Sequence, residues 1–295
     1  MTKDSHAMIV RFLFLGVCLA FLLPSPAVSG WEKNVQLNDT FLDPADVNSQ
    51  VFSPVTVPDG QGGTATVAIE FDIVTSQVWL SFNRVDAQGN GLFGTTGTRV
   101  IALPLDVFDD MDVAPDGSGG AFVALVLRQP TDTNFRVRVF RIDGAGTAVG
   151  PTSGVPLNTT GNEQVEPVAI ADGSGGVIVS CSEFTGAATG SDVAVQRFDA
   201  SLNRVWGNAG RYATQNVDTQ QRPVLAPDGA GGAFVAWEDR ANGTDLDVRV
   251  NRIDASGTVL FGTNGTFASS GGGDQEDPRI AADGLGNAWV VFTTE

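Results

Sequence analysis

Apolar and polar positions repeat in the same order several times along the chain. A short apolar segment such as 223–226 precedes the turn Pro-Asp-Gly-Ala-Gly-Gly, and a nearly continuous apolar segment, 233–237, follows it. A polar loop then leads to residues 247–254, where apolar and polar side chains alternate, and a short segment bounded by glycines ends the unit. Alternation and short continuous apolar runs are typical of β-strands. The pattern therefore predicts four antiparallel strands per unit, with no helical period.

Asp-Gly pairs mark the repeat, at steps of 55 to 57 residues, and begin at Asp59, Asp116, Asp172, Asp228 and Asp283. Repetition of a unit of this size indicates one supersecondary structure stacked side by side. Four-stranded units repeated radially predict an all-β fold, a β-propeller, with units near 54–110, 111–166, 167–222, 223–277 and a partial unit at 278–295. A parallel β-helix is the rival architecture, but its coils are shorter than this repeat.

The two ends of the repeat region leave its closure open. Residues 278–295 supply only the first two strands of a unit, and residues 31–53 read like the end of a preceding unit, with Trp31 in the position of Trp206. Either N-terminal residues complete the last blade of a five-bladed ring, or the chain is a fragment of a larger propeller. The missing alternating strand favours the fragment.

Residues 1–29 read as a signal peptide. Arg11 precedes the apolar run 12–23, and Ala27 and Ser29 are small residues placed for cleavage before Gly30. An uncleaved anchor is the alternative, but a span needs about 20 apolar residues. Cys18 lies within the run rather than at its end, which argues against a lipoprotein. We therefore expect residues 30–295 to be secreted or displayed at the cell surface, without membrane insertion after cleavage.

Composition excludes several functions. The chain has a net charge of −17 and no basic stripe, so nucleic acid is a poor partner. The one histidine, His6, lies in the signal segment, which excludes imidazole catalysis and most zinc sites from the mature chain. Cys181 is the one cysteine after residue 29, so no intramolecular disulfide can form. We expect no cofactor, with calcium as the exception considered below.

The segment Asp228-Gly-Ala-Gly-Gly-Ala-Phe-Val-Ala-Trp-Glu-Asp-Arg and the segment 247–257 resemble repeats of secreted bacterial β-propeller-like proteins. The resemblance covers residues 54–295 and is blurred at 64–72 and 121–129. Such repeats stand beside sorting or adhesion domains in long surface proteins. The resemblance implies a fold and a location, and it carries no catalytic set.

Recurring residues are interpreted as scaffold. An arginine stands two residues before an aspartate in four units, at Arg84, Arg141, Arg197 and Arg252. We interpret these arginines as polar contacts at strand ends, with the aspartates shaping the next turn. The alternative is a ring of anion-binding arginines like the cluster of sialidases, which share the propeller fold. Retaining sialidases need a tyrosine nucleophile, but Tyr212, the one tyrosine, lies in an ordinary final-strand position.

Three further groups of side chains were weighed. Cys181 occupies an apolar position of the second strand and is interpreted as a buried hydrophobe. Glu183, Glu238 and Asp239 follow second strands and could pair across a pocket as acid and base of a glycosidase. Hard oxygen ligands for calcium gather in two places, but no loop matches an EF-hand and solvated turns are the favoured interpretation; the residues are Asp106, Asp109, Asp110 and Asp112, and Asp245 with Asp247.

These observations lead to a non-catalytic extracellular β-propeller that binds a protein or glycan ligand on its ring face or in its central channel. No ligand-binding residue and no oligomeric state can be assigned. The alternatives are a glycan-acting hydrolase at the same face and a structural spacer of a larger surface protein.

Overall fold

The computed structural model describes residues 49–94, 96–186, 190–241 and 243–295. The predicted signal peptide at 1–29 and Trp31 lie outside the described residues. Described secondary structure consists of strands, arranged as five antiparallel sheets that follow one another along the chain. Within this part of the chain no helix is long and apolar enough to cross a membrane.

Each sheet is one blade with its strands in sequence order. The first blade contains β1 (Ser49–Pro58), β2 (Thr64–Asp72), β3 (Gln77–Val85) and β4 (Thr98–Leu103). The second contains β5 (Val107–Pro115), β6 (Ala121–Leu127), β7 (Arg136–Ile142), β8 (Ala148–Val149) and β9 (Val155–Pro156), where β8 and β9 both pair with β7.

The remaining blades follow the same order. The third contains β10 (Gln164–Ala171), β11 (Val177–Gly186), β12 (Gly190–Phe198) and β13 (Arg211–Tyr212). The fourth contains β14 (Gln220–Pro227), β15 (Ala233–Asp239), β16 (Asp247–Ile253) and β17 (Thr266–Ser269). Within the residues described here, the fifth contains two strands, β18 (Gln275–Ala282) and β19 (Ala288–Thr294).

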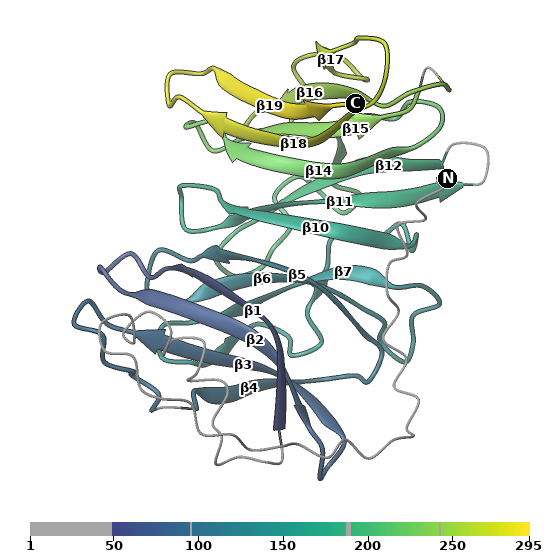
Figure 1. Ribbon diagram of the computed structural model, residues 1–295. Helices are drawn as coiled ribbons and strands as arrows, with labels where there is room; N and C mark the ends of the chain where they lie inside the picture. Colours follow the sequence, from purple (N-terminus) through teal and green to yellow (C-terminus); the bar gives the residue numbers. More distant parts are fainter. Residues whose placement is uncertain (1–48, 95, 187–189, 242) are drawn as a thin grey trace.

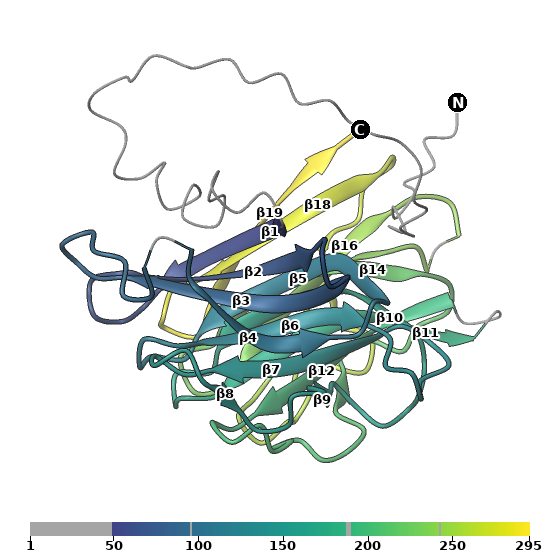
Figure 2. The ribbon, with the colours of Figure 1, turned by 90° about the horizontal axis from the view of Figure 1, so that it is seen from below.

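The blades stack through their first strands. β1, β5, β10 and β14 each contact the first strand of the next blade, and Figure 1 shows the five blades as a row from the purple β1–β4 to the yellow β18–β19. Figure 2 looks along this row, so that strands of successive blades overlie one another. The fold is a β-propeller of four-stranded antiparallel blades with an incomplete last blade, as the repeat predicted. The first and last blades lie at opposite ends of the row (Figure 1).

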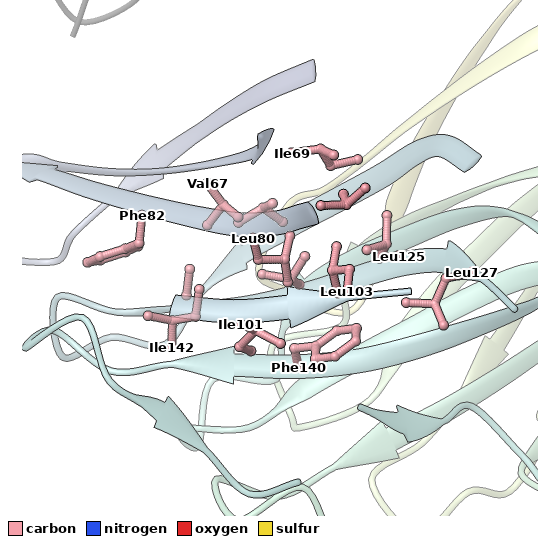
Figure 3. Packing of buried hydrophobic residues seen from close by; sticks show 14 of the residues in the cluster. Val67, Ile69, Leu80, Phe82, Ile101, Leu103, Leu125, Leu127, Phe140 and Ile142 are labelled. Carbon is pink, nitrogen blue, oxygen red and sulfur yellow. The ribbon is translucent and has the colours of Figure 1, made fainter. Parts of the chain in front are cut away.

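The hydrophobic core lies between blades rather than inside one sheet. Val67, Leu80 and Ile101 of the first blade pack against Leu125 and Phe140 of the second, and all five are at most 2% exposed; Figure 3 shows this cluster. Two further clusters fill the spaces between the second and third and between the third and fourth blades. Because both faces of a central blade are covered, its second strand is buried along most of its length and begins with apolar residues, and each fully buried large apolar side chain contributes about 1.5–3 kcal/mol.

Turns after the first strands are built the same way in each blade. In the fourth blade, Oδ1 of Asp228 accepts hydrogen bonds from the backbone N–H groups of Ala230 and Gly232, each at 2.8 Å. Oδ2 of Asp228 lies 3.0 Å from Nη2 of Arg252. We call this carboxylate with its turn and its arginine the Asp-Arg clasp.

The clasp recurs in the first four blades, where the pairs are Arg84–Asp59, Arg141–Asp116, Arg197–Asp172 and Arg252–Asp228. The second aspartate of each unit shapes the following turn, as Asp254 does through the N–H groups of Ser256 and Thr258. The interpretation of these arginines as scaffold is confirmed. The four guanidinium groups are occupied by buried carboxylates, which excludes the anion-binding ring.

Candidate functional site

The opposite ends of the first strands carry a second repeated feature, a bulge with strained backbone. The pairing of first and second strands shifts register between Val165 and Val168, between Gln221 and Val224, and between Glu276 and Arg279. One non-glycine residue in each bulge has a positive φ: 57° at Glu166, 51° at Arg222 and 52° at Asp277. Side chains other than glycine rarely adopt this conformation, and such strain clusters at functional sites.

Proline follows each of these residues in the sequence, at Pro167, Pro223 and Pro278. Proline lacks a backbone N–H, so it fits a bulge where the ladder of hydrogen bonds is interrupted. The bulge therefore turns the preceding side chain out of the sheet at the same place in the third, fourth and fifth blades. The identity of that side chain changes from blade to blade while its backbone does not.

Carboxylates of one blade hold the bulge of the next. The backbone N–H of Glu166 donates to Oδ2 of Asp110 at 2.8 Å, and the N–H of Arg222 donates to Oε2 of Glu166 at 2.8 Å. At the last bulge, the N–H of Asp277 donates to Oε1 of Glu238 at 2.9 Å. Each contact satisfies an amide that the bulge removes from the sheet, and it fixes the position of a charged side chain.

A cavity of about 320 Å³ opens where these bulges meet. Its charged lining comes from four blades and consists of Asp110, Glu166, Arg222, Asp277 and Arg279. Its apolar lining consists of the three bulge prolines together with Val168 and Val224. The cavity thus brings three carboxylates and two guanidinium groups together at the same end of the first strands. We call it the bulge cavity.

Hydrogen bonds orient the carboxylates of the bulge cavity. Ser182 Oγ donates to Oε2 of Glu166 at 2.6 Å, the same oxygen that accepts from Arg222 N–H. Arg222 Nη1 lies 3.2 Å from Oδ1 of Asp277 and 3.3 Å from Oε1 of the buried Glu238. One oxygen of Glu166 is therefore fixed by the protein, so its second oxygen has a defined direction relative to the cavity.

The carboxylates expected to act as an acid–base pair have other roles. Glu183 is fully buried and accepts hydrogen bonds from side chains that leave no place for a substrate: those of Asn158, Thr160, Asn162, Gln164 and Tyr212. Asp239 accepts from the N–H of Ala241 and lies 3.3 Å from Nε of Arg249. Of the three, Glu238 lies next to the bulge cavity, where its Oε1 accepts from the backbone N–H of Asp277 and lies near Nη1 of Arg222.

The environments of Cys181 and Tyr212, the two other side chains considered from the sequence, disfavour their ionised forms. Burial raises the pKa of the Cys181 thiol well above its ordinary value, and the negative charge of Glu183 raises it further. Burial also raises the pKa of Tyr212, whose hydroxyl donates to Glu183. Neither group is prepared to act as a nucleophile, because the ionised forms of both are disfavoured.

The two acidic clusters considered for calcium are dispersed among other contacts. Asp106 pairs with Arg128, Asp110 and Asp112 accept backbone N–H groups of the third blade, and the side chain of Asp109 lies outside the described residues. Burial raises the pKa of Asp112. Thr244 Oγ1 donates to Asp245, and Asp247 pairs with Asp239 in the sheet. The described residues contain no group of three or more side chains arranged to hold a metal ion.

The sequence analysis did not identify Glu166 and Asp277 as site residues, and it considered Asp110 only as a calcium ligand. A signal for them was present, because the residue before the first-strand proline is Ser53, Glu166, Arg222 or Asp277 in different units. A position that varies while its neighbours recur is where a site is expected in a repeat protein. The variation was visible, but the convergence of these side chains on one cavity was not.

No protein-family model and no curated protein matches the chain. Solved structures do match. An α-L-arabinanase from Penicillium chrysogenum is 14% identical with a TM-score of 0.43, covering 82% of this chain and 74% of that one. An α-L-arabinofuranosidase from Fusarium graminearum is 13% identical with a TM-score of 0.44 (81% and 71% covered). A levansucrase variant from B. megaterium is 10% identical with a TM-score of 0.41 (79% and 75%).

These matches correct two predictions. The predictions of a non-catalytic binding or display module and of a protein that is not an enzyme are contradicted by these matches, since the three solved structures are glycan-acting enzymes. Both predictions relied on the lack of histidine and of a recognisable catalytic set. Glycoside hydrolysis needs neither, since two carboxyl groups suffice. At this level of identity and overlap, the likeness says nothing about the substrate of this chain.

Proposed function

We propose that the protein is a glycan-acting hydrolase whose active site is the bulge cavity. The observation that carries the proposal is the convergence of Asp110, Glu166 and Asp277, from three different blades, on one cavity of about 320 Å³. Glycosidases hydrolyse their substrates with a pair of carboxyl groups that flank the scissile bond. The cavity offers such groups from the first strands of three blades, and bound sugar rings can pack on its prolines and valines.

In the proposed reaction, one carboxyl group donates its proton to the glycosidic oxygen as the bond from that oxygen to the anomeric carbon breaks. A second carboxylate takes a proton from the water that attacks the anomeric carbon, or it first forms a covalent glycosyl intermediate that water then releases. The separation of the two carboxyl groups decides between inversion and retention. Two of the three residues Asp110, Glu166 and Asp277 form the catalytic pair. The third carboxylate positions either the substrate or the pair.

The test replaces each cavity carboxylate by its amide in Asp110→Asn, Glu166→Gln and Asp277→Asn variants. An amide keeps an acceptor oxygen for the hydrogen bonds that hold the bulges, so the fold should persist. We expect two of the three variants to lose at least about 100-fold in kcat on polysaccharide substrates. Asp106→Asn, which changes an exposed carboxylate of the same segment paired with Arg128, is the matched control.

Activated aryl glycosides assign the roles, because a good leaving group needs no proton. The variant that lacks the general acid should recover most of its rate on these substrates, whereas the variant that lacks the nucleophile or base should not. Wild-type protein that releases no sugar from a broad panel of polysaccharides, or amide variants that all retain full activity, would disprove the proposal.

The proposal includes export, with a glycan outside the cell as the partner. It is supported by the charged and apolar pattern of residues 1–29. N-terminal sequencing of the secreted protein should begin at Gly30. Retention of the full chain inside the cell would contradict this part of the proposal.

A further inference from the structure

One position of the bulge cavity departs from the repeat. Val168, Val224 and Arg279 each stand two residues after the strained bulge residue of their blade, and all three line the cavity. In the third and fourth blades this position is therefore occupied by valine. An arginine at the same place in the fifth blade is not required by the architecture of a blade, and its long side chain loses more conformational entropy when it is ordered.

The guanidinium group of Arg279 is available to a ligand. The other arginine of the cavity, Arg222, is paired with Glu238 and Asp277. Arg279 donates one hydrogen bond, from Nη1 to the carbonyl oxygen of its neighbour Pro278 at 2.9 Å. Among the described residues, no carboxylate lies within ion-pair distance of Arg279. Nine of the fourteen described arginines form ion pairs, and Arg279 is the one member of the remaining five that lines the bulge cavity.

We infer that the bulge cavity takes glycans that carry a carboxylate, such as those built from uronic acids, and that Arg279 binds this carboxylate. The inference rests on the proposed function, because it names the substrate class of the same site. A guanidinium group offers two parallel N–H donors that match the two oxygens of a carboxylate. Arg279 would hold the acidic sugar at the fifth blade and leave the bond to be cleaved beside Glu166 and Asp110.

The negative charge of the protein opposes long-range attraction of an acidic glycan, so recognition has to come from direct contact. Asp110, Glu166 and Asp277 oppose the approach of any anion, so electrostatic steering cannot concentrate the substrate. Binding then depends on the direct pairing with Arg279. A guanidinium group also pairs with tetrahedral anions through two parallel N–H donors, so sulfated probes are needed to test whether the site selects a carboxylate.

Titration calorimetry with matched oligosaccharides tests the inference. The probes are oligosaccharides of galacturonic acid, guluronic acid and glucuronoxylan, each with its carboxyl-reduced neutral form, and sulfated galactan oligosaccharides as a third arm. The titration uses a background that the activity test shows to be inactive, Glu166→Gln or one of the other two amide variants, so that no turnover occurs. We expect at least one acidic probe to bind 10-fold or more tightly than its reduced form. Arg279→Gln should abolish this preference, whereas Arg279→Lys should retain part of it.

Arg240→Gln, which changes an exposed arginine in the loop after β15, is the control and should bind as the parent does. Equal binding of acidic and reduced probes, a preference that persists in Arg279→Gln, binding of no probe, or equally tight binding of sulfated probes would each overturn the inference. Hydrolysis of neutral glycans without any acidic preference would leave the proposed hydrolase intact. The opposite outcome is an acidic preference that depends on Arg279 in a wild-type protein that releases no sugar from any glycan. It would disprove the proposed hydrolase and support the recognition of acidic glycans.

Discussion

The two ends of the first strands follow opposite rules. At the Asp-Gly end, the first four blades repeat the same Asp-Arg clasp with nearly the same distances. At the bulge end, the same backbone strain presents a carboxylate, a guanidinium or another carboxylate in successive blades. Recurrence at one end marks what every blade needs in order to fold. Variation on a constant backbone at the other end marks where chemistry can be placed without loss of the scaffold.

The difference predicts that the two ends can be damaged separately. Substitutions in the clasp should lower stability and leave the intrinsic activity of the folded protein unchanged. Amide substitutions in the bulge cavity should lower activity and leave stability nearly unchanged.

Loss of a buried clasp carboxylate should have the largest effect on stability. Asp228→Ala removes two turn hydrogen bonds and leaves Arg252 without its partner, which we expect to lower the free energy of unfolding by about 3 kcal/mol. Asp283→Ala is the matched control. Asp283 caps its turn through the N–H groups of Leu285 and Asn287 in the exposed fifth blade, so its loss should cost about 1 kcal/mol. Urea denaturation measures both, and equal losses would show that the arginine adds nothing.

Acid should weaken the clasp. Burial raises the pKa of Asp228, but the N–H groups of Ala230 and Gly232, and then Arg252, lower it by more, so that it lies below its ordinary value; the same balance lowers the pKa of Asp59. A carboxyl group whose pKa is lower in the folded state contributes stability that is complete above the unfolded value of 3.8 and is lost as the pH falls through the folded value.

Melting temperatures measured from pH 7 to pH 2 should therefore fall at the acidic end. The Asp228→Asn variant, which lacks one titrating carboxyl group of the clasp, should lose less of its own stability over this interval. An equally steep acid dependence in wild type and variant would exclude a contribution from Asp228.

Contact between clasps of neighbouring blades should have a smaller effect. Gly119 has a φ of +90°, and a Cβ atom there would lie 2.6 Å from Cζ of Arg84. Gly175 has a φ of +87°, and a Cβ atom placed there would have nothing within 4 Å. Alanine strains the backbone equally at both sites, so Gly119→Ala should cost about 1 kcal/mol more than Gly175→Ala. Identical losses would mean that Arg84 moves aside freely.

The smallest expected effect concerns Cys181. Burial raises the pKa of its thiol, so the reactive thiolate is scarce in the folded protein. A thiol reagent at pH 8 should label the folded chain only at the rate of unfolding. The Asp228→Ala variant should be labelled faster in proportion to its lower stability. Rapid labelling of the wild type would show that the second strand of the third blade opens independently of the clasp.

Much of the fold followed from local patterns. Alternation predicted β16 at Asp247–Ile253, and the apolar segment after each Asp-Gly turn predicted the second strands, because a strand covered on both faces is rich in apolar residues. The scaffold role of the four arginines followed from recurrence alone. Neither the carboxylates that hold the bulges nor the exclusion of Glu183 from any pocket could be predicted, since both depend on contacts between residues of different strands or blades.

The sequence by itself determined the blade, its four strands, its turns and its period, because turn geometry and strand burial depend on neighbouring residues. Only the tertiary structure decided which of many carboxylates meet in one cavity. Asp110, Glu166 and Asp277 are separated by more than 50 residues at each step, and they converge because the bulges of successive blades stack at one end of the first strands. That convergence is a property of the stacking of blades, and no segment of the chain contains it.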